Sequence, residues 1–332
     1  MQTLAHDAIE LLRSRYLSAE LPQTSTAQAF DDLFLPEWQK NTSAGGLPLR
    51  SEDPHAIVMY LHSSGSTAYP KPVPWSGHRL VQISLIPWFG ERDLCDVLFA
   101  VHVMPMYHGL VITRLCWTAS SGLVVGAFEP KFPATLPTPD KLFASAKAVS
   151  SDLIFCVLSF VEPFLRHGPT VWSILNGWPR VCGVLYSGGP LNKVIGDDLK
   201  SKGSDIFIVY GSTECSIISS ILPAKSSYDW DYFEFPGFIA PEMMPNGKNL
   251  YEFVMVKNAF CVPSIINTDI NGVDAYATSD LLMRHPTKPG LWKILGRTDD
   301  QIVHNTGEKR NPIPLESMLN QDPHVSAAVM FG

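Results

Sequence analysis

The 332-residue chain has few charged side chains, no long hydrophobic run and no cluster of cysteines. Charged residues make up 17% of it and the formal net charge is −7, which excludes a general nucleic-acid-binding protein, because such binding needs a basic face that displaces counterions from phosphates. No apolar stretch approaches the roughly 20 residues that cross a bilayer. Residues 1–16 carry acids and lack the apolar core of an export signal. We therefore expect a cytoplasmic protein that does not enter a membrane.

The cysteines stand singly and form neither a C-x-x-C pair nor a His-rich cluster, which excludes a zinc site or a disulfide framework. Most of them lie inside apolar runs: Cys95, Cys116, Cys156, Cys182, Cys215 and Cys261. We expect buried free thiols that pack as small hydrophobic side chains. Hydrophobic residues reach 45% of the chain, which is typical of a globular protein with about two domains, or one large domain with an appendage.

Short apolar runs alternate with longer amphipathic ones between about residues 55 and 210. The runs "AIVMYL", "DVLFAVHVM", "DLIFCVL", "VCGVLY" and "DIFIVY" predict buried strands, and the segments between them predict helices. This alternation predicts an α/β fold with right-handed βαβ units and a parallel sheet that has helices on both faces. Ligands of such sheets bind beyond the carboxyl ends of the strands. The loops that directly follow strands are therefore the candidate site.

The character of the chain changes after about residue 215. Aromatic, β-branched and proline residues dominate in "YDWDYFEFPGF", "LYEFVMV" and "LWKIL", which predicts an antiparallel β region. The polar stretch "GRTDDQ" near residue 296 is suited to a hinge. The final run "HVSAAVMFG" predicts a strand, which would need a partner to cover its edge.

One loop, "SSGSTAYPK" at residues 63–71, has the parts of a phosphate cradle. Its small residues, Ser64, Gly65, Ser66 and Thr67, let backbone N–H groups approach an anion, and Lys71 supplies a positive charge. It is not the G-x-x-x-x-G-K-[ST] loop, so a P-loop ATPase lacks its motif here. No G-x-S-x-G elbow is present either, which excludes an α/β-hydrolase. Taken alone, the loop is equally well explained as a Ser/Gly turn with a solvated lysine.

Four further motifs follow predicted strands in order. They are "LYSGGPL" with Ser187, Gly188 and Gly189, "VYGSTEC" with Tyr210, Gly211, Ser212, Thr213 and Glu214, "YATSDL" with Asp280, and "GRTDDQI" with Arg297, Asp299 and Asp300. Each has an ordinary explanation: a Gly-Gly turn, a turn-capping aspartate, or a surface ion pair of little energetic weight. Their order and their placement after strands favour one shared site.

This series resembles the core motifs of the adenylate-forming (ANL) superfamily, which includes acyl-CoA synthetases, luciferases, and the adenylation domains of nonribosomal peptide synthetases and carboxylic acid reductases. "PKPVPWS", "PMYHG" and "HNTGEKRNPIPLE" are most similar to fungal, aminoadipate-reductase-like adenylation domains of secondary metabolism. The resemblance runs from about residue 56 to the C-terminus. It implies the large-domain core of that superfamily, with parallel sheets, helices on both faces and an added antiparallel β region.

The resemblance implies a reaction in which a carboxylate attacks the α-phosphate of ATP, yielding an acyl-adenylate and pyrophosphate. Positioning and charge neutralisation supply most of the catalysis in such a transfer. The loop from Ser63 to Lys71 would hold the β- and γ-phosphates, Thr213 the α-phosphate, and Glu214 a Mg²⁺ ion. Ser187, Gly188 and Gly189 would flank the adenine of ATP or AMP, and Tyr210 would stack on it, with Gly211 and Ser212 in the same site. Asp280 would accept from the ribose hydroxyls with help from Arg297, and Asp299 would be the hinge.

The resemblance says less about the substrate. His108 in "PMYHG" matches the gate of the acyl pocket and completes the implied catalytic set of Lys71, Thr213, Glu214 and His108; without the family, a core histidine bonded to a backbone carbonyl is favoured. "PMYHGLVIT" offers no carboxylate to hold a substrate ammonium, which favours a non-amino carboxylic acid, aryl or aliphatic. The expected pocket walls are Tyr107, His108, Phe155, Phe160 and the segment around Ser187. The acyl acceptor would be coenzyme A or a phosphopantetheinyl carrier protein.

Three departures from the family pattern qualify this interpretation. Ala68 and Ser279 stand where glycine is common, and the second change is expected to be mild. The small C-terminal domain, with its lysine, is expected to be largely missing. The expected division is an N-terminal helix and connector left from the first subdomain (1–55), an α/β nucleotide-binding core (56–215), a β-rich subdomain (216–296), and a hinge with the start of the C-terminal domain (297–332). Two hypotheses stay open: an acid-activating ligase, or a non-catalytic nucleotide-binding remnant or regulatory protein.

Overall fold

The structure is a computed structural model that describes residues 10, 13–14, 53–63, 71–102, 108–129, 131, 133–157, 160, 183–201, 203–223, 229–299, 302–303, 309–310, 312–320, 322, 324–325 and 328–330. The chain divides into two compact units, residues 1–52 and 53–332. In the first unit Glu10 and Arg13 are helical and form an ion pair at 2.6 Å. In the described part of the chain, none of the helices has the length and hydrophobicity that a membrane span requires.

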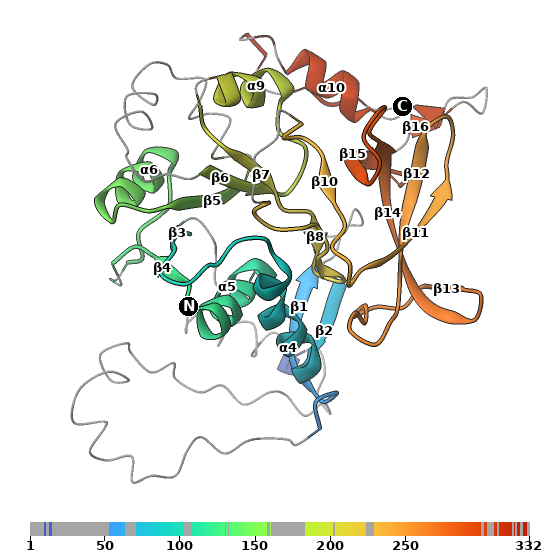
Figure 1. The fold of residues 1–332 in the computed structure, drawn as a ribbon, viewed down its shortest axis with the longest axis horizontal. Helices are drawn as coiled ribbons and strands as arrows, with labels where there is room; N and C mark the ends of the chain where they lie inside the picture. Colours follow the sequence, from blue (N-terminus) through green and yellow to red (C-terminus); the bar gives the residue numbers. More distant parts are fainter. Residues whose placement is uncertain are drawn as a thin grey trace. The chain divides into compact units, whose positions relative to one another are not determined.

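A five-stranded parallel sheet forms the centre of the second unit, which confirms the α/β prediction (Figure 1). Its order is β4-β3-β5-β6-β7, with every neighbouring pair parallel. The strands are β3 (Leu98–Ala100), β4 (Val124–Gly126), β5 (Leu153–Val157), β6 (Gly183–Ser187) and β7 (Ile206–Ile208). The accompanying helices are α5 (Gly109–Ser121), α6 (Pro139–Ala148) and α9 (Lys193–Ser201). All five residues of β6 are buried, as expected for a central strand that is covered on both faces.

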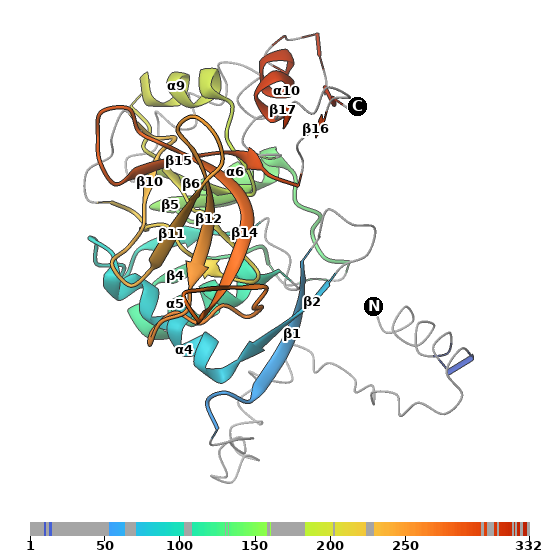
Figure 2. The same ribbon diagram turned by 90° about the vertical axis from the view of Figure 1, so that its right-hand side faces the viewer.

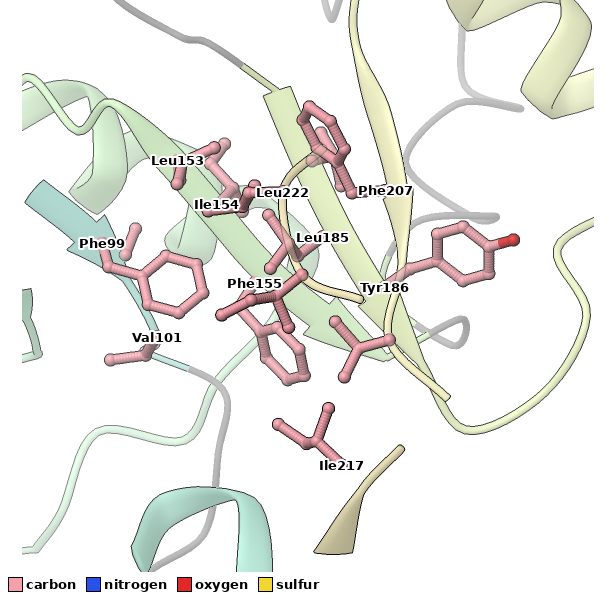
Figure 3. Packing of buried hydrophobic residues seen from close by; sticks show 14 of the residues in the cluster. Phe99, Val101, Leu153, Ile154, Phe155, Leu185, Tyr186, Phe207, Ile217 and Leu222 are labelled. Atoms are coloured by element: carbon pink, nitrogen blue, oxygen red, sulfur yellow. The ribbon is translucent and has the colours of Figure 1, made fainter. Parts of the chain in front are cut away.

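Side chains from this sheet build the larger hydrophobic core. Figure 3 shows the rings of Phe99 and Phe155 close together, and their centroids are 5.9 Å apart in an edge-to-face arrangement. Ile154 and Leu185, on the neighbouring strands β5 and β6, are 0% and 1% exposed. The apolar runs of the sequence therefore predict the core, because an inner strand of a parallel sheet such as β6 is buried along its whole length, whereas Val124 of the edge strand β4 is 43% exposed.

The predicted antiparallel β region is also confirmed. A six-stranded sheet has the order β10-β15-β14-β12-β11, with β13 pairing β14. The strands are β10 (Phe233–Glu234), β11 (Ala240–Pro245), β12 (Leu250–Val256), β13 (Thr268–Ile270), β14 (Val273–Arg284) and β15 (Leu291–Arg297). A second hydrophobic cluster, which includes Phe253, Met255 and Leu282, packs on this sheet.

The first apolar run, "AIVMYL", was predicted as a strand of the parallel sheet, and this is wrong. It forms β1 (Ile57–Ser63), which pairs antiparallel with β2 (Lys71–Ser76) in a separate hairpin, visible beside the large sheets in Figure 2. Ile57 and Tyr60 are 53% and 64% exposed, so an apolar run here does not mean burial on both faces. In β2 the residues Val73 and Trp75 are buried and alternate with prolines, which cannot donate to a further strand.

Helix α4 (Gly77–Leu85) follows the hairpin, and short elements follow β15. The hydroxyl of Ser76 caps α4 by accepting from the Arg79 amide, and the helix continues into the 3₁₀ helix η1 (Ile86–Phe89). Beyond β15 lie β16 (Ile302–Val303), β17 (Lys309–Arg310) and α10 (Ile313–Leu319).

The predicted terminal strand is wrong for the residues that the structure describes. The backbone amides of Ala328 and Met330 donate to the side chains of Asn320 and Glu316 at 2.7 Å in each case, in place of a strand partner. Val329 is 76% exposed, so the apolar composition of this run does not reflect burial.

The cysteine prediction holds in part. The four cysteines whose side chains are described are free; Cys215 and Cys261 are buried and Cys116 is half-buried. Cys95 is exposed, against expectation, because it lies in a turn before β3. Burial raises the pKa of Cys215 to about 12, which agrees with a packing role. Among the described residues, no group of three His, Cys, Asp or Glu side chains could hold a metal ion.

Candidate active site

Two strand ends and the start of one helix meet at a cavity of about 170 Å³. Ser187 and Gly188 come from the end of β6, Gly211, Ser212 and Thr213 follow β7, and His108 precedes α5. The remaining lining residues are Trp75, Gly109, Leu110, Thr113, Val157, Val209, Ser216 and Ile217. Three motifs that were selected from the sequence therefore share one cavity at the carboxyl edge of the sheet.

The turn that carries Thr213 and Glu214 joins two very short strands, β8 (Gly211–Ser212) and β9 (Ser216–Ile217). Ser212 Oγ accepts from the Cys215 amide at 3.2 Å, and Ser216 has a left-handed backbone with φ of 66°. Gly211 is required by close approach, because a Cβ there would overlap the Ser216 carbonyl oxygen. The result is a tight turn that carries Thr213 and Glu214, both half-buried, and of these two Thr213 lines the cavity.

The Gly-Gly turn after β6 needs glycine for a different reason. Gly188 has φ of 93°, in the left-handed region that favours glycine, whereas a Cβ there would meet only Val157, at 3.9 Å. The space next to the Gly188 Cα is therefore open. Ser187, which precedes the turn, is 9% exposed.

A hydrogen-bonded chain of side chains connects the core with the end of β15. The Tyr210 hydroxyl donates to Asp280 Oδ2 at 2.6 Å, and Arg297 donates to Asp280 Oδ1 at 3.1 Å. Arg297 also makes two bonds of 2.8 Å to the carboxylate of Asp299. Asp280 and Arg297 face each other in the register of β14 and β15, which brings the third and fourth motifs together. Sequence reasoning placed these residues in one site but missed the Tyr210–Asp280 bond.

Burial dominates the electrostatics of this chain of side chains. It raises the pKa of Asp280, while the Tyr210 hydroxyl and the Arg297 guanidinium act in the opposite direction. Burial, followed by the Asp280 charge, raises the pKa of Tyr210 well above its usual value, so its hydroxyl stays a donor. Burial, followed by the charge of nearby Glu214, also raises the pKa of the Tyr276 hydroxyl.

Tyr210 is more enclosed than a base-stacking role alone requires. The residue is 6% exposed and its ring packs against Phe233 with centroids 4.8 Å apart. The predicted stacking on adenine stays a prediction.

His108 caps α5 and is not the buried core histidine of the simpler interpretation. Its Nδ1 accepts from the Leu110 amide at 3.3 Å, and the residue is exposed where it lines the cavity. Desolvation, followed by nearby His62, lowers the pKa of His108, so the ring is neutral at pH 7.

The structure places the other predicted residues as follows. Lys71 is exposed and pairs with Ser63 at the end of the β1–β2 hairpin where the connecting loop begins and ends. Phe155 was expected in the pocket wall, but it is 4% exposed and faces the core beneath the cavity. Phe160 also packs against that core. Several residues lie outside the described part of the chain: Ser64, Gly65, Ser66, Thr67, Ala68, Tyr107 and Asp300.

The serine at position 279 is a larger departure than expected. Its φ of 64° lies in the left-handed region, which costs an L-residue roughly 1–2 kcal/mol. Its carbonyl accepts from the Thr298 amide at 2.7 Å, which ties β14 to the residue after β15.

Sequence reasoning missed two residues that bond to the Thr213–Glu214 turn. Trp75 Nε1 donates to the Thr213 carbonyl at 2.9 Å, and Arg79 donates to the Glu214 and Cys215 carbonyls at 2.9 and 3.1 Å. The available signal was an arginine on the apolar face of a helix, one turn before Ile83.

Known proteins are similar to this chain in sequence and in fold. The family described as AMP-binding enzyme matches residues 6–245, and the family described as AMP-binding enzyme C-terminal domain matches residues 299–332. The adenylate-forming reductase Nps10 of Heterobasidion annosum is 45% identical over 333 residues, covering 99% of this chain and 30% of that protein. The adenylate-forming reductase Nps9 of Serpula lacrymans var. lacrymans is 31% identical over 291 residues, covering 83% of this chain and 26% of that protein. The chain thus spans less than a third of the length of these relatives.

Solved structures show the same fold. ATP-bound MatB from Rhodopseudomonas palustris aligns with a TM-score of 0.63 and 20% identity, covering 83% of this chain and 55% of that one. The o-succinylbenzoate CoA synthetase MenE from Bacillus subtilis, in complex with its acyl-adenylate intermediate, aligns with a TM-score of 0.62 and 19% identity, covering 83% of this chain and 56% of that one. Most of the sequence lies within the matched family, and the chain therefore belongs to the AMP-binding enzyme family, with fungal adenylate-forming reductases among its relatives.

Proposed function

We propose that this chain activates a carboxylic acid with ATP, forming an acyl-adenylate and releasing pyrophosphate. The observation that carries the proposal is the single cavity shared by His108, the Ser187–Gly188 turn and the Gly211–Thr213 turn. An acid and a nucleotide phosphate must meet in one place for this reaction, and the cavity lies where three strand- and helix-end motifs converge.

The donor and acceptor groups suit a nucleoside triphosphate. Ser216 Oγ is buried, has no partner among the described residues, and belongs to a residue that lines the cavity. The carboxylate of Asp280 accepts one bond on each oxygen, which leaves acceptor capacity for hydroxyl groups, and its side chain is 15% exposed. An unsatisfied hydroxyl and a partly satisfied carboxylate are the groups that a phosphate and a ribose would complete.

Each motif then has a role. Residues 63–71, with Lys71, hold the β- and γ-phosphates, Thr213 binds the α-phosphate, and Glu214 supplies a hard oxygen for Mg²⁺. Mg²⁺ would neutralise phosphate charge. The substrate carboxylate attacks the α-phosphorus and the bond to the pyrophosphate oxygen breaks. Donors fixed around the α-phosphate stabilise the charge that develops on its oxygens.

The nucleoside end and the hinge complete the assignment. Gly188 and Gly189 flank the adenine, on which Tyr210 stacks, and Asp280 accepts from the ribose hydroxyls. Asp299, bonded to Arg297 at the end of β15, is the hinge before the C-terminal segment. The division at residues 55, 215 and 296 is part of this proposal and rests on the changes in sequence character at those positions.

The cavity favours an acid without an amino group. No acidic residue is among the described side chains that line it, so a substrate ammonium would have no counter-charge. Leu110, Val157, Val209 and Ile217 supply apolar wall, which suits an aryl or aliphatic acid, with His108 as its gate. Coenzyme A or a phosphopantetheinyl carrier protein is the proposed acceptor.

The test is ATP–pyrophosphate exchange by the full chain with a panel of aryl, keto and fatty acids. Exchange that depends on both an acid and Mg²⁺ supports acid activation. AMP or ATP binding without exchange for any acid would instead identify a non-catalytic nucleotide-binding protein.

A further inference from the structure

Arg79 is a buried cation whose bonds all go to uncharged groups. Its residue is 3% exposed, and its guanidinium donates to the carbonyls of Glu214 at 2.9 Å, Cys215 at 3.1 Å and Val262 at 2.7 Å. A fourth bond, of 3.0 Å, goes to Ser264 Oγ. Burying a guanidinium is costly, so its retention here, with four acceptors around it, points to a specific structural task.

The acceptors belong to two segments that are distant in sequence from Arg79. Glu214 and Cys215 form the turn between β8 and β9, whereas Val262 and Ser264 lie in the connection between β12 and β13. The Ser264 amide also donates to the Glu214 carbonyl at 2.8 Å, so the two segments are joined at the arginine. Figure 1 shows α4 below the β8 region, where this junction lies.

Trp75 extends the same contact by one residue. Its Nε1 donates to the Thr213 carbonyl at 2.9 Å, so Trp75 and Arg79 together bind the carbonyls of three successive residues of the turn. Trp75 lies in β2, which begins at Lys71, and Arg79 lies in α4, which directly follows β2. The two elements that follow Lys71 therefore both bond to the Thr213–Glu214 turn.

We propose that Arg79, assisted by Trp75, is the positioning residue that fixes Thr213 and Glu214 relative to β2, which begins at Lys71. This rests on the proposed function, in which these groups bind different parts of one triphosphate. Arg79 touches neither substrate nor metal; it fixes the backbone, so that the Thr213 hydroxyl and the Glu214 carboxylate keep their positions while phosphate charge develops. Preorganised groups of this kind act without reorganisation at the moment of reaction.

The experiment compares the full chain with Arg79→Lys. A lysine ammonium lacks the planar fork of donors and cannot bridge the same carbonyls. Amide hydrogen exchange in a peptide covering residues 211–218 should become about tenfold faster, while exchange in β12 stays unchanged. In the ATP–pyrophosphate exchange assay, the apparent dissociation constant for Mg²⁺ should rise about 10- to 100-fold. This is the range found when residues that hydrogen-bond to a metal ligand are removed.

Arg114→Lys is the matched control, because Arg114 is also buried, at 9% exposure, and donates to a carbonyl, that of Val101 at 2.9 Å. The Arg114→Lys variant should leave amide hydrogen exchange in residues 211–218 unchanged. If Arg79→Lys does not fold, Trp75→Phe decides, since it removes only the donor to Thr213 and should raise exchange in the same peptide.

Two outcomes overturn the proposal. One is unchanged amide hydrogen exchange at residues 211–218 in the folded Arg79→Lys variant. The other is an unchanged apparent dissociation constant for Mg²⁺ together with a smaller fraction of active protein, because a purely structural role of Arg79 would give that result. A parent chain without pyrophosphate exchange would refute the proposed function instead. The hydrogen-exchange comparison would still decide whether Arg79 holds the turn.

Discussion

Replacing Asp280 by asparagine tests the nucleoside end of the site directly. Asparagine keeps the shape of the side chain and can still accept from the Tyr210 hydroxyl, which lies 2.6 Å from Asp280 Oδ2. The negative charge that would accept from a ribose hydroxyl is lost. The perturbation therefore removes one proposed contact while keeping the packing of Tyr210.

The expected magnitude follows from the surroundings of Asp280. A hydrogen bond to a charged group contributes about 1.5–3 kcal/mol. The side chain is 15% exposed, so solvent screening is small, but Tyr210 and Arg297 already draw on its charge. We therefore expect the lower end, about 1.5 kcal/mol, which corresponds to about a tenfold change in affinity.

The assay is calorimetric titration with AMP and with 2′,3′-dideoxy-AMP. The parent should bind the dideoxy ligand about tenfold more weakly, whereas Asp280→Asn should bind both ligands with similar affinity. Asp299→Asn is the control: Asp299 also binds Arg297, at 2.8 Å, but is not the proposed ribose acceptor, so discrimination should persist. If Asp280→Asn discriminates as strongly as the parent, Asp280 does not accept from the ribose.

Three further predictions concern charge, pH and packing. Lys71→Ala should weaken ATP binding in calorimetry without lowering the unfolding temperature, because Lys71 is exposed; undiminished ATP affinity would reject its phosphate role. Because burial raises the pKa of Asp280 in the folded state, the folded state binds the proton more tightly than the unfolded one, and its stability falls as pH rises from about 4 through the folded-state pKa. The urea-unfolding free energy of the parent, measured relative to Asp280→Asn, should therefore increase as pH is lowered from 7 towards 4, and a difference independent of pH would contradict this. Gly196→Ala should cost about 1–3 kcal/mol in urea unfolding, because a Cβ there would overlap the buried Trp230 ring, whereas Gly237→Ala, with nothing within 4 Å, should be nearly neutral.

The sequence was most informative where one residue type carries the signal by itself. Runs such as "DLIFCVL" predict β5 because a strand that is covered on both faces must be apolar throughout. Gly188 marks a backbone with positive φ, and its place after an apolar run locates it at the edge of the sheet. The same rule failed for β1, because an apolar run in an exposed hairpin has the same composition as a buried strand.

The order of the motifs, the parallel and antiparallel regions and the family were thus determined by the sequence alone. Only the tertiary structure decided how the motifs are joined. Tyr210 bonds to Asp280 across 70 positions, and Arg79 bonds to the Cys215 carbonyl across 136. Every residue has a backbone carbonyl, so an acceptor of this kind leaves no mark in the amino-acid sequence, and its partner can be identified only when the folded chain brings the two together.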